Sequence, residues 1–208
     1  ANKLLARFLA AHAAELDLRL LAFSGGTLRN AIPREAFATV AVESHKADAL
    51  KSAAAQFLSA IKNEHGIKEP NIALVTEPLA HQGDALSTDS RDRFLNLLNS
   101  TPNGVIRNSD VAKGVVETSL NIGVVTMEAD HAEINCLIRS LIDTGRDYVV
   151  QMLTSLGQLA GAQTKAKGGY PGWQPDADSA IMALTRQTYI ALFDKTPNIQ
   201  VIHAGLEC

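Results

Sequence analysis

The sequence predicts an α/β fold, a two-layer α+β sandwich in which an antiparallel sheet carries helices on one face. Segments of helical periodicity alternate with strand-like segments, and the order helix, strand, strand, helix, strand occurs twice along the chain. The content of 46% hydrophobic and 20% charged residues is ordinary for a globular domain. The two halves share little sequence identity, so the predicted repeat is one of architecture.

The first half is predicted to contain a helix over residues 1–14, strands near 17–24 and 35–43, a helix near 45–64 and a strand near 71–76. The strands are predicted from alternating apolar residues, and the helices from apolar residues spaced three and four apart. The apolar faces of the two helices consist of Leu4, Leu5, Phe8 and Leu9, and of Ala47, Leu50, Ala54, Phe57, Leu58 and Ile61.

The second half repeats this order, with a short helix near 88–99, strands near 117–127 and 132–141, a helix near 145–160 and a strand near 162–167. The same periodicity argument applies to each of them. The helical apolar faces consist of Phe94, Leu95 and Leu98, and of Val149, Met152, Leu153, Leu156 and Leu159. Three polar residues of the first strand, Thr118, Ser119 and Asn121, either face a cleft or make cross-strand hydrogen bonds.

The remaining segments are predicted to be connections, except for a helix and a strand near the end of the sequence. Residues 78–88 join the two halves, and residues 107–110 form a polar loop. From Gly168 the character changes, because the sequence YPGWQP at 170–175 suits neither a regular helix nor a central strand. A helix then begins at Asp178 or Ser179, and a strand follows near 199–203.

Composition excludes several classes of function. The net charge of −3 and the scattered Lys and Arg residues give no reason to expect a nucleic-acid partner. No segment is apolar enough to predict a membrane span, so no membrane partner is expected. The two cysteines, Cys136 and Cys208, do not form a disulfide framework, and free thiols suit a cytoplasmic location.

The segment SGGTLRNAIP at 24–33 is the most informative in the chain. It follows a strand-like run, and Gly25 and Gly26 allow the backbone to leave the β region before Pro33 closes the excursion. A carboxamide held on such a loop, that of Asn30, offers one acceptor and two donors to a group above the sheet. Alternatively, these are ordinary turn residues, and Asn30 bonds only its own backbone.

This segment closely resembles the Gly-Gly-x-x-x-Asn-x-x-Pro segment of the aminoacylase and carboxypeptidase-like zinc metallopeptidases. Within that family, six further segments are similar to those of the aminoacyl-histidine (Xaa-His) dipeptidases. They are NKLLARFL at 2–9, TPNGVIR at 101–107, GVVETSLN at 114–121, LIRSLID at 137–143, YPGWQP at 170–175 and HAGLEC at 203–208. The resemblance covers the chain from end to end.

The resemblance implies that the chain is the middle of a longer enzyme that hydrolyses Xaa-His dipeptides, carnosine-like ones included. Residues 1–167 would be its lid domain, and residues 168–208 a crossover with the first helix and strand of the resumed catalytic domain. That last helix would expose apolar surface in the isolated chain. The parent enzyme would use two divalent metals, zinc or similar. Lids of this family pair, which makes a homodimer an expected partner beside the dipeptide and the catalytic domain.

No catalytic residue and no metal ligand is expected within this chain, and none of the metals is expected to bind it. The family's His-x-Asp metal motif does not occur, and none of the six histidines pairs with a carboxylate at a convincing spacing. His131 lies beside Asp130 in a predicted turn, where both side chains are expected to be solvated rather than to bind a metal. The isolated chain is therefore expected to be inactive.

Three residues are predicted to bind substrate, each by resemblance. Asn30 matches the lid asparagine that reaches the substrate over the metal site, and Arg139 matches a lid arginine that binds the substrate's carboxylate end. A guanidinium suits a carboxylate because two parallel N–H groups meet two oxygens. From the sequence pattern alone, Arg139 could equally pair with Asp143 or face water. Glu207 lies in a glycine-bearing turn that lines the substrate pocket in relatives.

Two other functions remain open from the sequence. A non-catalytic α/β module that binds an amino acid or assembles subunits would have this architecture too, because a fold does not fix a function. A peptidase-like enzyme acting on an N-acyl amino acid or a ureido compound is the other, although the end-to-end dipeptidase resemblance argues against it.

Overall fold

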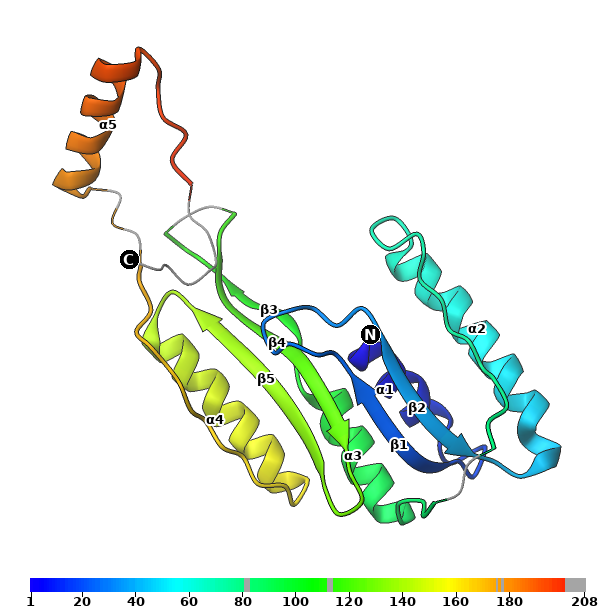
Figure 1. Ribbon diagram of the computed structural model, residues 1–208. Coiled ribbons are helices and arrows are strands. Elements are labelled where there is room, and N and C mark those ends of the chain that lie inside the picture. The colour runs from blue at the N-terminus through cyan, green and yellow to red at the C-terminus, as the bar shows by residue number, and fades with distance from the viewer. Residues whose placement is uncertain (81–82, 112–113, 175, 177, 201–208) are drawn as a thin grey trace. The chain divides into compact units, whose positions relative to one another are not determined.

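The computed structural model describes residues 1–80, 83–111, 114–174, 176 and 178–200 (Figure 1). Five α-helices, a short 3-10 helix and five strands follow one another along this part of the chain. They are α1 (Asn2–His12), β1 (Arg19–Gly25), β2 (Ala36–Ala41), η1 (Ser44–Lys46), α2 (Ala47–His65), α3 (Thr88–Ser100), β3 (Gly104–Asn108), β4 (Val116–Met127), β5 (Ala132–Ser140), α4 (Asp143–Leu159) and α5 (Ala180–Phe193).

The strands form one sheet in the order β2-β1-β4-β3, with β5 paired to β4. The pairs β1–β2, β1–β4 and β3–β4 are antiparallel. The long strand β4 pairs with β3 through its first residues and with β1 only at Val125 and Thr126. The predicted α/β class with an antiparallel sheet is therefore confirmed.

The chain divides into two compact units, each with strand residues of its own. Unit 1 consists of Ala1–Pro102, Asn121–Leu137 and Thr154–Thr164, and unit 2 of Asn103–Leu120, Ile138–Leu153 and the chain from Lys165 onward. The predicted domain boundary between residues 167 and 168 is a different division, and it stays a prediction.

The core of unit 1 lies between the sheet and helices α1, α2 and α3. Phe23 of β1 and Phe94 of α3 meet edge to face, with ring centroids 5.5 Å apart. The opposite face of β1–β2 is open, since Ser24 and its partner Phe37 are both exposed. The buried apolar residues of this core are Ala6, Phe8, Leu9, Ala13, Leu16, Leu18, Leu20, Phe23, Ala54, Phe94, Leu95, Leu98, Ile122 and Val125.

The predicted strand at 71–76 does not form. The segment runs as extended chain back alongside α2 (Figure 1). Ile72 and Leu74 are half-buried while Ala73 and Val75 are exposed, and Leu74 packs against the core. The alternation therefore reflects which side chains face the helices rather than pairing in the sheet, and Pro70 and Pro78 remove backbone donors on both sides.

One further predicted strand is wrong, and another lies mostly outside the described residues. At 162–167 the chain turns back at the end of α4, where the Ala162 N–H donates to the Gly157 carbonyl at 2.7 Å, and its residues are exposed. For the strand predicted near 199–203, residues 199 and 200 are irregular, and the rest lie outside the described residues.

The predicted polar loop at 107–110 is partly wrong, because Arg107 and Asn108 belong to strand β3. This strand pairs with β4 with shifts in register, and four of its five residues are exposed. Its pairing comes from backbone groups, so it leaves no alternating apolar pattern in the sequence.

Helix α5 exposes its apolar side chains, as predicted. None of its residues is buried, and Ile181, Leu192 and Phe193 are 69%, 71% and 58% exposed. In the part of the chain that the structure describes, no helix combines the length and the hydropathy that crossing a bilayer requires.

Candidate substrate-binding site

Asn30 lies on the connection between β1 and β2, in the segment of residues 26–33 that we call the Asn30 loop. The antiparallel ladder ends at the pair Gly25 and Ala36, just outside it. Within the loop, the Ala31 N–H donates to the Leu28 carbonyl at 3.2 Å, so Asn30 occupies the third position of a turn. Asn30 is exposed, and its carboxamide makes no hydrogen bond within the described part of the chain. Its donors and acceptor are available to a ligand.

Asn121 of β4 ties this loop to the sheet. Its Nδ2 donates to the carbonyl oxygens of Arg29 at 2.9 Å and of Ala31 at 2.8 Å. These two carbonyls flank Asn30. The cross-strand hydrogen bond that was one alternative for Asn121 is therefore not made, because both partners lie on the loop between β1 and β2. The two contacts join residues that are 92 and 90 positions apart in the chain, so no local sequence pattern predicts them.

Two glycines allow the loop to lie directly on β4. Gly26 has a positive φ of 75°, and a Cβ on it would stand 1.9 Å from the Gly123 carbonyl oxygen. A Cβ on Gly123 would stand 2.4 Å from both Cα and O of Arg29. The atoms in the way belong to the backbone, so neither position has room for a side chain.

Arg139 lies half-buried on β5 in unit 2. Its neighbour Ser140 bonds Thr118 Oγ1 at 2.8 Å and lies next to Gly145 of α4. Because side chains alternate along a strand, Arg139 points to the sheet face away from α4. The Ser140–Thr118 bond also shows that Thr118 takes the cross-strand option.

The guanidinium of Arg139 makes no hydrogen bond or ion pair with any described residue. The alternative pairing with Asp143 does not occur. Asp143 Oδ1 instead accepts from Arg146 Nη1 at 3.0 Å and from the Gly172 N–H at 2.9 Å. A half-buried guanidinium that bonds no residue of the described chain is suited to binding an anionic group.

Two of the three predicted residues lie in different units, and the third is not among the described residues. Asn30 belongs to unit 1 and Arg139 to unit 2, and each is placed only within its own unit. Glu207 lies outside the described residues. A surface pocket of about 340 Å³ occurs in unit 2, next to the Arg107–Glu117 ion pair and Tyr148, and it is lined by none of the three.

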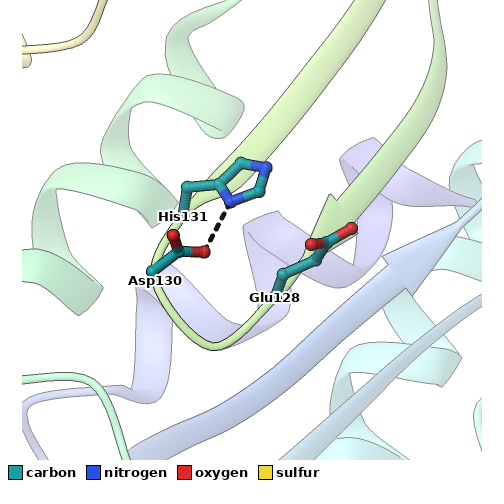
Figure 2. Close-up of side chains that lie close together, drawn as sticks. All are labelled: Glu128, Asp130 and His131. Carbon is teal, nitrogen blue, oxygen red and sulfur yellow. Dashed lines mark hydrogen bonds and ion pairs between the residues drawn. The ribbon is translucent and has the colours of Figure 1, made fainter.

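One group of three side chains in the described residues could approach a cation together. Glu128, Asp130 and His131 lie at the turn between β4 and β5, which the Glu128 N–H closes by donating to the His131 carbonyl at 2.8 Å (Figure 2). All three are exposed, and His131 Nδ1 is bonded to Asp130 Oδ1 at 2.8 Å. A solvated turn of this kind explains the group without an ion.

The pH dependence of this turn can be tested. The hydrogen bond to Asp130 raises the pKa of His131 above 6.5, and the same bond lowers the pKa of Asp130. The His131 contribution to stability is therefore complete below its unfolded pKa and is lost as the pH rises through its folded pKa. The Asp130 contribution is lost as the pH falls through its own folded pKa.

We expect an NMR titration to place the His131 midpoint above 6.5, and Asp130→Asn to lower it. Glu128→Gln should have a smaller effect, because Glu128 acts only through charge. An unchanged His131 midpoint in Asp130→Asn would contradict the pairing.

Cys136 of β5 is half-buried, and burial raises the pKa of its thiol to about 11. A thiol of this kind is mostly protonated at neutral pH and a weak nucleophile. Cys136 is a free thiol, as the sequence predicted.

Comparison with known proteins gives a consistent result. Residues 1–69 match the family model described as Peptidase dimerisation domain. The chain is 68% identical over 208 residues to the cytosol non-specific dipeptidase of Escherichia coli (strain K12), covering 100% of this chain and 43% of that protein. The crystal structure of aminoacylhistidine dipeptidase from Vibrio alginolyticus matches with a TM-score of 0.95 and 52% identity, over 99% of this chain and 42% of that one.

The chain therefore spans less than half the length of both relatives. Their similarity confirms the predicted family resemblance and the fold class. It extends beyond residues 1–69 to the whole sequence, including both units.

Proposed function

We propose that this chain is the lid portion of a dipeptidase, because its residues 1–69 match the Peptidase dimerisation domain and the chain is similar along its length to two dipeptidases. The lid would close over a site built by flanking sequence and would bind the dipeptide. The observation that carries this proposal is the 68% identity to a dipeptidase along the entire chain. The name of that relative also supports a cytoplasmic location.

We propose that the metal ions, zinc or similar, are held by residues outside this chain. A two-metal centre needs several convergent carboxylates and histidines in a protected site. The described residues do not fit this requirement, since Glu128, Asp130 and His131 are exposed on one turn. No step of hydrolysis is therefore assigned to them.

The substrate class that we propose is the dipeptide with a C-terminal histidine, carnosine-like substrates included. One relative is named an aminoacylhistidine dipeptidase and the other a non-specific dipeptidase, so acceptance of other dipeptides is part of the proposal. In this arrangement the Asn30 carboxamide bonds the peptide and Arg139 binds its terminal carboxylate. Glu207 is a third proposed contact, from the segment after α5.

The overall proposal is tested by assaying the full-length polypeptide that carries this chain against a panel of dipeptides, with and without a metal chelator. Hydrolysis of Xaa-His dipeptides that the chelator abolishes is the expected result. Absence of any dipeptide hydrolysis, together with calorimetric binding of free amino acids by the chain alone, would favour the non-catalytic alternative.

The substitution Asn30→Ala in that full-length protein is expected to lower kcat/KM by about 10- to 100-fold, because an oriented polar contact to the substrate is lost. Metal content should be unchanged, since Asn30 is proposed to contact only substrate. The matched control is Asn63→Ala, which removes an exposed carboxamide from α2. Equal kcat/KM for the two variants would remove Asn30 from the proposed site.

A second function, dimerisation, is favoured by the match of residues 1–69 to the Peptidase dimerisation domain. It is compatible with the first, since a lid can carry the subunit contact as well. Sedimentation analysis of the full-length protein, beside the chain alone, distinguishes a homodimer held by this region from a monomer.

A further inference from the structure

Asn121 binds both carbonyl groups that flank the proposed substrate-binding residue Asn30. Resting on the function proposed above, we propose that Asn121 is a positioning residue, which fixes the Asn30 loop and thereby the direction of the Asn30 carboxamide. Asn121 would not itself touch the substrate. Its two N–H groups are the donors to Arg29 O and Ala31 O, so its amino group is fully used.

The two bonds constrain a very short piece of backbone. Arg29 O belongs to the peptide plane before Asn30, and Ala31 O belongs to the plane two residues further on. Holding both planes leaves only the backbone angles of Asn30 and Ala31 between them, and the Ala31 N–H is engaged with Leu28 O at 3.2 Å. The Cα of Asn30 is therefore fixed on both sides while its side chain stays exposed.

The anchor itself sits on a rigid element. The next residue along β4, Ile122, is 1% exposed and belongs to the core of unit 1. Contact of the loop backbone with β4 at Gly26 and Gly123 adds a steric limit, since neither has room for a side chain. A binding residue on a loop gains precision when a second residue on a strand holds that loop.

The test uses Asn121→Ala, Asn121→Asp and the double variant Asn30→Ala/Asn121→Ala in the full-length protein. Asn121→Ala is expected to lower kcat/KM about tenfold and to leave metal content unchanged. The Asp variant should lose at least as much, because a carboxylate would face two carbonyl oxygens. In the double variant, Asn121→Ala should have little further effect, since a residue acting through Asn30 has nothing left to position.

Hydrogen exchange of the peptide covering residues 26–33 gives a readout that does not depend on catalysis. Asn121→Ala should accelerate exchange there, and Asn63→Ala should not. Full additivity in the double variant, or unchanged exchange in Asn121→Ala, would overturn the positioning role. If the unmodified protein hydrolyses no dipeptide, the proposed function fails, and the exchange result alone decides whether Asn121 holds the loop.

Discussion

Gly26→Ala is expected to lower the free energy of unfolding by about 2–5 kcal/mol. Two separate costs combine in this estimate: about 1–2 kcal/mol for a side chain at positive φ, and about 1–3 kcal/mol for overpacking. The overpacking arises because the new Cβ would meet the Gly123 carbonyl oxygen at 1.9 Å, and a backbone atom in a strand cannot move aside easily. The Asn30 loop would have to lift off β4, so binding through Asn30 should weaken as well.

The measurement is urea denaturation of the variant beside Gly169→Ala. Gly169 has no heavy atom within 4 Å of an added Cβ, and its φ is not positive, so its substitution should change stability by less than about 0.5 kcal/mol. Equal unfolding midpoints for the two variants would contradict the close contact between the loop and β4.

Arg139→Ala is expected to lower kcat/KM of the full-length enzyme by about 30- to 1000-fold, which corresponds to roughly 2–4 kcal/mol of lost binding in a closed site. The physical reason is the loss of paired N–H donors to the substrate's terminal carboxylate. Folding should be little affected, because Arg139 makes no hydrogen bond or ion pair with the described residues.

The substrate can be changed to identify the group that Arg139 binds. A dipeptide with an amidated C-terminus lacks the carboxylate, so Arg139→Ala should change its turnover little. With the free dipeptide, kcat/KM of Arg139→Lys should lie between those of the unmodified enzyme and of Arg139→Ala, since an ammonium keeps the charge but loses the bidentate geometry. Arg93→Ala, which removes an exposed arginine from α3, is the control. An equal loss for free and amidated substrates would assign Arg139 another role.

The spacing of apolar residues predicted the helices well, because the residues on the buried face of a helix recur three and four positions apart in the sequence. All six apolar residues predicted for α2, from Ala47 to Ile61, are at least half-buried, and Phe94, Leu95 and Leu98 of α3 are buried. Leu159 is an exception at 86% exposure, because it lies in the last turn of α4. The strands were harder to predict, since alternation records burial and not pairing, as residues 71–76 show.

For the candidate site, the sequence indicated Asn30 and Arg139 only through family resemblance. Their surroundings could not be predicted, because the supporting contacts join distant parts of the chain. Asn121 meets the Asn30 loop from a different strand, and Asp143 is taken by Arg146 and Gly172 rather than by Arg139. Spacing within a segment contains no information on such contacts.

The discontinuity of unit 1 has a consequence for how the protein is made. Its sheet needs residues from β4, and Asn2 reaches the Ile122 carbonyl 120 positions away. While a ribosome is still synthesising residues 103–120, the emerged chain holds β1 and β2 without the strand that completes them. A nascent polypeptide stalled after Pro102 would leave Ser24 and Gly25 of β1 without their partners on β4. Its core would also lack Ile122 and Val125, so it would expose an unpaired strand edge and apolar surface, the features that make incompletely folded chains prone to aggregation.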